Sequence, residues 1–495
     1  MPTADMSVLL TFAAYLIMML AIGVWAYRKT QGVSDYFLGG RSLGPVPAAL
    51  SAGASDMSGW LLLGLPGYAY AAGAEALWLA AGLLLGFWLN WRLMARRLRR
   101  YTIRCQDALT VPEYLSRRFA DQSGLLQLIA AIVILLFFLF YTGSGLVAGG
   151  KLFASVFAMD YHVAVVVGAV CVVSYTLFGG FLAVTWTDVV QGLLMMVALL
   201  LVPLVILLQL NGSPSESLAN INPQLLNSMT DADGFPLSAI AIISLLAWGL
   251  GYFGQPHILA RFAATKSDSA IATARKISVS WNLLCQIGAL LVGMCGLIYL
   301  HQHQMPALQD SETIFIQMVG LLFHPWIAGV LLAAILAAVM STADSQLLVS
   351  SSAFTEDLYR RWLKPHASQQ ELVWTGRLTV VVVCLLATAL AWDPDTSVLN
   401  LVAYAWAGFG SAFGPVLLLS LYWRRMTRIG ALAGMIVGGL TVVIWRPLSG
   451  GLFDLYEMVP GVLLAVIAIV IGSRLSAEPP ASIKADFDAV NAKES

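Results

Sequence analysis

Residues 50–60 decide the fold, and they read Leu50-Ser51-Ala52-Gly53-Ala54-Ser55-Asp56-Met57-Ser58-Gly59-Trp60. Apolar residues flank this run, so Asp56 falls near the middle of a membrane span, where a carboxylate costs about 2.5–3.5 kcal/mol. Glycine allows a helix to unwind, and unwinding frees carbonyl oxygens that can replace the water around a small cation. We therefore predict a broken membrane helix at a binding site. The alternative is a structural carboxylate bonded to neighbouring backbone.

The composition is that of an integral membrane protein. Hydrophobic residues make up 59% of the 495 residues and charged residues 11%, compared with about 25% charged residues in soluble domains. Mean hydropathy is +0.80. Apolar runs of about 20 residues, the length of a helix that crosses a bilayer, recur along nearly the whole chain. We expect an all-α polytopic membrane protein with a single transmembrane domain over residues 1–474.

The sequence contains no sign of reactive chemistry. The five cysteines are scattered without metal-like spacing, and the six histidines have no partner spacing typical of hydrolysis or metal binding. The net charge is zero and gives no indication of nucleic-acid binding. We therefore predict neither an enzyme nor a nucleic-acid partner.

About thirteen membrane-spanning helices are predicted, each near the length that a bilayer requires. The first covers residues 6–27, and the last two lie within 430–474. The other ten form two blocks, residues 48–210 and 237–423. The remaining residues, 475–495, are expected to form a disordered cytoplasmic tail.

The basic residues predict the orientation, because cytoplasmic loops are enriched in Lys and Arg. If the N-terminus lies outside, all of the 27 Lys and Arg except Lys151 and Arg446 fall on the inner side. Arg261 is assigned to an inner loop in this pattern. An odd number of spans follows, with the N-terminus outside and the C-terminus inside. Arg41 is placed at the inner mouth, where it either takes part in gating or marks topology alone.

A second interruption lies in the seventh predicted span and reads Trp248-Gly249-Leu250-Gly251-Tyr252-Phe253-Gly254-Gln255-Pro256. The first interruption lies in the second span, five spans earlier, so the two run through the bilayer in opposite directions. This pattern indicates an inverted five-helix repeat and a transporter with its site near the bilayer midplane. Trp248 and Tyr252 are four residues apart and predict an aromatic wall. Glycines that serve only close helix packing are the alternative.

A third polar run lies in the ninth predicted span and reads Ala337-Ala338-Val339-Met340-Ser341-Thr342-Ala343-Asp344-Ser345. Positions 338, 341, 342 and 345 share one helical face. The hydroxyls of Ser341 and Thr342 are hard neutral ligands, which suit a monovalent cation better than zinc or copper. Alternatively, both hydroxyls bond back to a carbonyl four residues earlier, as is common in helices.

Taken together, these motifs resemble the sodium:solute symporter family. Four stretches carry the resemblance, which covers almost all of the chain: Gly39–Pro45, Leu50–Trp60, Trp248–Arg261 and Ile335–Thr342. It implies the amino-acid transporter type fold, with a five-plus-five inverted repeat and two broken helices, and sodium as the coupling ion. Three further runs resemble family members that carry L-proline: Thr185–Asp188, Gly251–Ile258 and Tyr404–Trp406.

The resemblance also implies the residues of the site. The sodium ligands would be the backbone carbonyls of Ala54, Met57 and Ala338 and the hydroxyls of Ser341 and Thr342. Asp56 would assist the cation electrostatically. The substrate positions would be Ser58, Gly59, Tyr141, Trp248, Tyr252 and Pro256. Polar groups and aromatic faces in such a set fit a zwitterion with an apolar ring.

A second sodium site is a separate hypothesis. In relatives that bind a second ion, an acid matching Asp188 cooperates with hydroxyls one turn beyond the main pair, and those positions here are Asp344 and Ser345. We expect a 1:1 stoichiometry, with a second site at Asp188, Ser341, Asp344 and Ser345 as the competing prediction. The alternative bonds Asp344 to a basic neighbour at the inner membrane face.

The combined prediction is sodium-coupled secondary active uptake of L-proline by alternating access, across a bacterial cytoplasmic (inner) membrane. The expected partners are sodium, L-proline and the lipid bilayer, with no obligate protein partner. Two alternatives remain open. One is symport of another small solute, such as a sugar, pantothenate or another amino acid, and the other is a sensor or channel built on the same fold.

Overall fold

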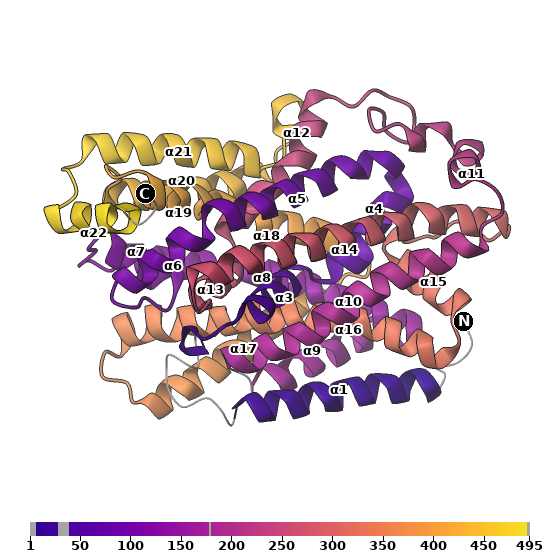
Figure 1. Ribbon diagram of the computed structural model, residues 1–495, viewed down its shortest axis with the longest axis horizontal. Helices are drawn as coiled ribbons and strands as arrows, with labels where there is room; N and C mark the ends of the chain where they lie inside the picture. The colour runs from indigo at the N-terminus through magenta and orange to yellow at the C-terminus, as the bar shows by residue number, and fades with distance from the viewer. Residues whose placement is uncertain (1–5, 28–38, 178–179, 493–495) are drawn as a thin grey trace.

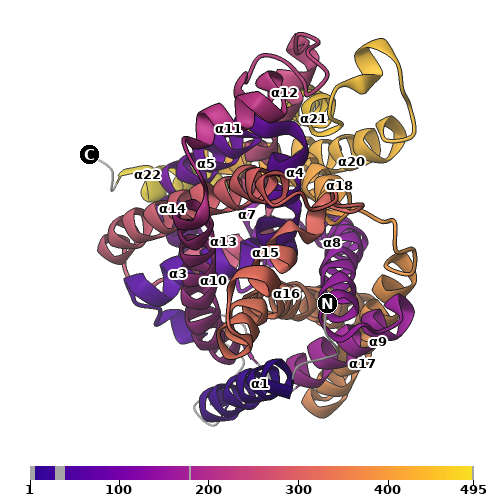
Figure 2. The same ribbon diagram turned by 90° about the vertical axis from the view of Figure 1, so that its right-hand side faces the viewer.

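The computed structural model describes residues 6–27, 39–177 and 180–492, and these residues form helices joined by loops. The long helices lie roughly side by side along the longest axis of the molecule (Figure 1). Viewed from the end, they form a bundle with α16 (Pro325–Ser352) in its interior and α10 (Phe181–Gln209) packed beside it (Figure 2). Because α16 is buried along most of its length, it can bring polar side chains to the centre of the bundle.

Ten helical stretches of the described residues are long and apolar enough to cross a membrane, or up to eleven if one bent pair counts as a span. Their main helices are α1 (Met6–Tyr27), α5 (Ala76–Leu93), α8 (Leu125–Phe157), α10, α14 (Asp268–Gln302), α16, α17 (Gln369–Leu390), α18 (Val398–Ala412), α20 (Arg428–Trp445) and α21 (Met458–Leu475). The predicted count of thirteen is therefore not confirmed.

Two local features account for the difference between thirteen and the eleven spans obtained when the bent pair is counted. Helix α9 (Tyr161–Thr176) has 16 residues and spans about 24 Å, less than a bilayer core of about 30 Å. The stretch Trp60–Arg104 is counted once, although Gly73 has a φ of 59° and separates α4 (Leu65–Ala72) from α5. A side chain at Gly73 would collide with the backbone of Leu225, so only glycine fits this turn.

The first predicted interruption is present. Helix α3 (Pro45–Asp56) begins with a proline in its first turn and ends at Asp56. Met57 and Ser58 lie outside any helix, and the chain resumes at Gly59 before η2 (Trp60–Gly64) and α4. Every residue from Ala48 to Gly67 is buried, so the break lies inside the bundle.

The second predicted interruption is also present. Helix α12 (Ala239–Ala247) continues into the tighter turn η5 (Trp248–Gly254), Gln255 is extended, and α13 (Pro256–Ala264) begins at the proline. The two halves are bent by 48° relative to one another. Helix α13 packs against α3, so the two broken segments lie side by side. Helices α10, α14 and α16 pack against α3 as well.

The two ends of the bundle differ in chemistry. Helix α11 (Pro214–Ile221), in the polar segment that has no Lys or Arg, lies at the end where α1 begins (Figure 1). The basic helix α6 (Ala95–Arg104), together with α7 (Val111–Arg118), lies at the opposite end. A membrane crossed by this bundle would therefore separate the polar loop from the basic helices, as the sequence predicts.

The prediction of a disordered tail is wrong for most of its length. Helix α22 (Ala481–Asn491) forms there and buries Ile483, Phe487 and Val490, which recur at helical spacing on one face. Asp486 pairs with Arg104 at 2.7 Å, and a second ion pair joins the helix to the loop before α20. This short amphipathic pattern is the signal in the sequence that indicates the helix. Residues 493–495 of the tail lie outside the described residues.

Candidate substrate and sodium site

The predicted sodium ligands gather where α16 passes the break in α3. Ser341 Oγ donates a hydrogen bond to the carbonyl oxygen of Ala54 at 2.8 Å and to that of Ala338 at 3.2 Å. Thr342 Oγ1 lies 3.5 Å from the Ala54 carbonyl. Met57 lies in the break, fully buried, with a φ of −79° and a ψ of 79°, outside the helical conformation. Two carbonyls and two hydroxyls thus form a set of neutral oxygens, the ligand type that fits a sodium ion.

The carboxylate of Asp56 connects the two broken helices. Tyr252 Oη donates to Asp56 Oδ2 at 2.9 Å. The backbone carbonyl of Asp56 accepts hydrogen bonds from Tyr141 Oη at 2.7 Å and from Trp60 Nε1 at 3.2 Å. The alternative of a carboxylate bonded only to neighbouring backbone is therefore wrong, because the partner is a side chain of the second break. Among the described residues Asp56 Oδ1 has no hydrogen-bond partner, which leaves a buried acceptor for a cationic group.

Aromatic rings cover one side of this carboxylate. Trp406 of α18 stands edge-on to Tyr252, with ring centroids 4.8 Å apart, and lies 6.1 Å from Trp248. Trp248 also stacks on Tyr456 at 5.7 Å. The predicted wall of Trp248 and Tyr252 therefore has Trp406 at its centre. In the sequence Trp406 belongs only to a run that carries the family resemblance, and its place beside Tyr252 comes from the packing of α18.

The remaining substrate positions lie on either side of the break. Ser58 Oγ accepts a hydrogen bond from the backbone N–H of Trp60 at 3.5 Å. Gly59 packs so closely on α8 that a Cβ there would collide with the Cβ of Ala148. Pro256 lines a cavity beside α6 and α7, whereas Trp248 lines a separate pocket. The structure thus joins Ser58, Gly59, Tyr141 and Tyr252 at the break and places Trp248 and Pro256 in separate pockets.

Arg41 connects three segments near the cavity that Pro256 lines. Its Nε pairs with Asp107 at 2.8 Å, and its Nη1 and Nη2 donate to the carbonyls of Ala263 at 2.7 Å and Ala108 at 3.1 Å. These partners belong to the end of α13 and to the turn between α6 and α7. Burial lowers the pKa of the Arg41 guanidinium, although neighbouring Asp107 acts in the opposite direction. The contacts show that Arg41 has a tertiary role beyond topology.

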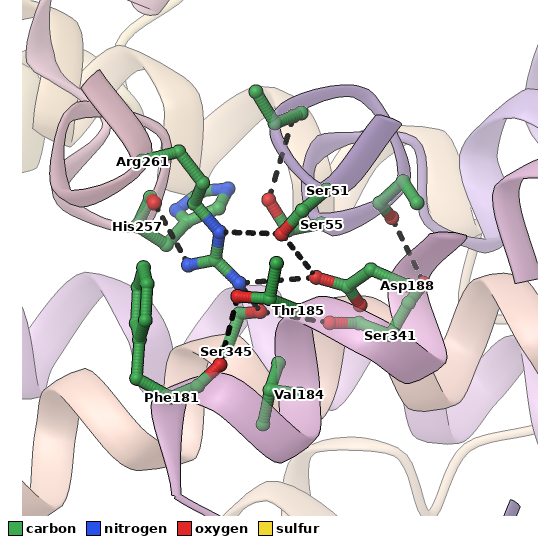
Figure 3. Close-up of polar contacts among 12 residues, drawn as sticks. Ser51, Ser55, Phe181, Val184, Thr185, Asp188, His257, Arg261, Ser341 and Ser345 are labelled. Atoms are coloured by element: carbon green, nitrogen blue, oxygen red, sulfur yellow. Dashed lines mark hydrogen bonds and ion pairs between the residues drawn. The ribbon is translucent and has the colours of Figure 1, made fainter. Parts of the chain in front are cut away.

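A buried arginine occupies the region of the hypothetical second sodium site. Arg261 was predicted in an inner loop, and this is wrong: it lies within α13 and is 1% exposed. Its Nη2 contacts Asp188 Oδ2 at 3.2 Å and Ser345 Oγ at 2.6 Å (Figure 3). Its Nε donates to Ser51 Oγ at 3.0 Å, and Ser51 in turn donates to Asp188 Oδ2 at 2.6 Å.

Asp344 does not belong to this cluster. Its Oδ1 accepts a hydrogen bond at 2.5 Å from Thr176 of α9, so the predicted alternative of a basic partner is also wrong. Ser345 Oγ donates to the carbonyl of Ser341 at 3.0 Å, which connects the cluster to the sodium ligands. Of the four residues proposed for a second site, Asp188 and Ser345 contact Arg261, and Ser341 is joined to Ser345 through its carbonyl. Asp344 instead faces α9.

The sequence profile of the sodium:solute symporter family matches residues 36–438, and the chain belongs to this family. Among its relatives, the sodium/proline symporter of Escherichia coli strain K12 is 53% identical over 484 residues, which cover 97% of this chain and 95% of that protein. The high-affinity proline transporter PutP of Bacillus subtilis strain 168 is 50% identical over 473 residues, which cover 95% of this chain and 98% of that protein.

Two solved structures share the fold. A Na⁺-coupled sialic acid symporter, in a substrate-bound outward-open state, matches with a TM-score of 0.79 at 23% identity, over 96% of this chain and 99% of that chain. Mhp1, a nucleobase-cation-symport-1 family transporter, matches with a TM-score of 0.56 at 14% identity, over 93% and 100% of the two chains. The helical bundle therefore has the same fold as these two proteins.

Proposed function

We propose that this protein couples the inward movement of sodium to the uptake of L-proline across a bacterial cytoplasmic membrane. One observation carries the proposal: the hydroxyl of Ser341 meets the carbonyl of Ala54 at the break in α3, only two residues before Asp56. An ion site and a substrate site then share one unwound segment. Two relatives whose names include proline transport are at least 50% identical over nearly the whole chain, which supports proline as the substrate.

Sodium stabilises the segment that proline needs. An ion held by the carbonyls of Ala54, Met57 and Ala338 and the hydroxyls of Ser341 and Thr342 connects α3 to α16. This fixes the position of Asp56 against Tyr252. Asp56 Oδ1, which has no hydrogen-bond partner in the described part of the chain, then attracts the ammonium group of proline, while the aromatic faces beside it receive the pyrrolidine ring. Coupling is a reciprocal binding free energy between two sites, and no covalent step is involved.

The membrane potential supplies part of the driving force. One positive charge that crosses the membrane gains about 2.3 kcal/mol per 100 mV. Because about 1.4 kcal/mol is a factor of ten, one sodium per proline supports a roughly fiftyfold accumulation before any sodium gradient is added. Alternating access follows if one group of helices rocks against another around the site.

The topology proposed here has thirteen spans, with the N-terminus outside and the C-terminus inside. It counts the α3–α4 and α12–α13 pairs as one broken span each and includes α9. Blocks 48–210 and 237–423 then form inverted repeats, each of which begins with a broken helix. In this orientation Arg41 lies at the inner mouth, and its bonds to Asp107 and Ala263 hold that mouth closed. Gating requires these bonds to open.

Uptake of radiolabelled L-proline into proteoliposomes tests the function. An inward sodium gradient is compared with an equal potassium gradient, for the wild-type protein and for Asp56→Asn. We expect sodium-dependent accumulation that the substitution abolishes, while unlabelled proline competes and sugars or pantothenate do not. Uptake of a different solute under sodium would refute the substrate assignment. Proline flux that does not depend on sodium would refute the coupling.

A further inference from the structure

Three oxygen-bearing side chains converge on one buried point beside the sodium ligands. They are Ser51 of α3, Asp188 of α10 and Ser345 of α16, and Figure 3 shows them around the guanidinium of Arg261. A carboxylate with two hydroxyls is a donor set that suits a hard monovalent cation. The guanidinium engages all three, with contacts of 2.6–3.2 Å. A positive charge that belongs to the chain thus occupies the place that these donors would offer to an ion.

Burial makes the charge of Asp188 costly unless a cation or a proton compensates it. The side chain of Asp188 is 0% exposed and that of Arg261 is 1% exposed. Loss of the cationic partner of a buried carboxylate is strongly destabilising, because the negative charge is left without compensation. If Arg261 is removed, the carboxylate either attracts a mobile cation or takes up a proton. In the transport assay the most abundant cation is sodium. We therefore expect sodium to bind the oxygen atoms of Ser51, Asp188 and Ser345 when the guanidinium is absent.

The position of Arg261 holds its charge in place. Its Nη1 donates to the carbonyl of His257 one turn earlier in α13 at 2.9 Å, and its guanidinium lies over the ring of Phe181, 5.2 Å from the centroid. The guanidinium is therefore directed at Asp188 by contacts on both sides. Its bond to Ser51 also connects the second broken helix to α3. Ser51 lies three residues before the predicted sodium ligand Ala54.

We propose that Arg261 acts as a tethered cation at Asp188, in the place of a second sodium ion, and thereby limits coupling to one sodium ion per proline. This inference rests on the proposed function and deepens it, because it assigns the stoichiometry to one side chain. It also accounts for a donor set that resembles a cation site in a transporter for which one ion per substrate is expected.

The test measures ²²Na⁺ and ³H-proline fluxes in the same proteoliposomes. For the wild-type protein we expect a ratio of one. Arg261→Gln keeps much of the side-chain volume and removes the charge, and we expect its flux ratio to rise to two, with a Hill coefficient for sodium above one. Arg261→Lys retains a tethered cation and keeps the ratio at one. Arg118→Gln is a matched control, because Arg118 is equally buried but bonds to another helix, α19 (Gly414–Tyr422), through the carbonyl of Ser420 at 3.1 Å.

Equilibrium binding of ²²Na⁺ to the purified protein counts the bound ions even in a variant that no longer transports. Purified Arg261→Gln should bind two ²²Na⁺ ions per chain, and Asp188→Asn combined with Arg261→Gln should bind one, because it lacks the carboxylate. A ratio of two in the wild-type protein, or one ion per chain in folded Arg261→Gln, would overturn the inference. If Arg261→Gln does not fold while the neutral double variant does and binds one ion, sodium cannot replace the guanidinium, and the inference is also overturned. Wild-type uptake of proline without sodium would instead refute the proposed function.

Discussion

Replacement of Ser341 by alanine tests the sodium site at one defined atom. Ser341 Oγ lies 2.8 Å from the carbonyl oxygen of Ala54 and 3.2 Å from that of Ala338, and all three residues are fully buried. An ion among these oxygens uses Ser341 Oγ as a ligand, and a polar contact to a charged group contributes about 1.5–3 kcal/mol. Because about 1.4 kcal/mol is a factor of ten, Ser341→Ala should raise the half-saturating sodium concentration roughly ten- to hundredfold.

The assay is proline uptake at graded sodium, with potassium keeping the total salt constant. Ser341→Thr retains the hydroxyl and should stay close to the wild-type sodium dependence. Ser350→Ala is the matched control, because Ser350 is a buried serine farther along the same helix and away from the ligands. A shift of less than twofold in Ser341→Ala, or an equal shift in Ser350→Ala, would show that the hydroxyl is not a sodium ligand.

Three further substitutions test other parts of the account. Tyr252→Phe removes the hydroxyl 2.9 Å from Asp56 Oδ2, so equilibrium binding should show proline affinity reduced about tenfold; unchanged affinity would contradict this. Gly59→Ala sets a Cβ against that of Ala148 and should lower the melting temperature, and a neutral effect would refute the close packing. The pKa of Asp121 lies below its usual value. Burial acts to raise this pKa, but the hydrogen bonds that the carboxylate accepts, including one from a guanidinium, outweigh burial. Asp121→Asn should therefore cost stability at neutral pH, and the difference should shrink as the pH falls through the lowered pKa; a constant difference would contradict it.

Much of this site follows from local sequence pattern. The runs around Asp56 and Tyr252 combine glycine with polar residues inside apolar segments. Both runs become breaks because glycine, which has no Cβ, allows the backbone to leave the helical conformation. Ser341 and Thr342 share a face with Ala338, so a helix alone brings them together. The meeting of that face with Ala54 follows from the family resemblance and not from spacing.

The errors concern contacts between segments that are distant in sequence. Arg261 follows a glycine-rich run and precedes a basic loop, so local pattern assigned it to the membrane surface. Only the packing of both α13 and α10 against α3 shows that Asp188 lies beside it. Asp344 faces Thr176 across a separation of 168 residues, which no spacing argument could anticipate. Helix α22 was overlooked because its apolar stripe is short and its ion pairs are tertiary.

Equilibrium binding of ³H-proline to the purified protein, in sodium and in potassium at equal ionic strength, measures the coupling between the two sites. We expect sodium to raise the affinity for proline, and proline to raise the affinity for sodium by the same factor, because the two sites share the break in α3. Proline affinity that is the same in both salts would contradict the claim that sodium completes the proline site.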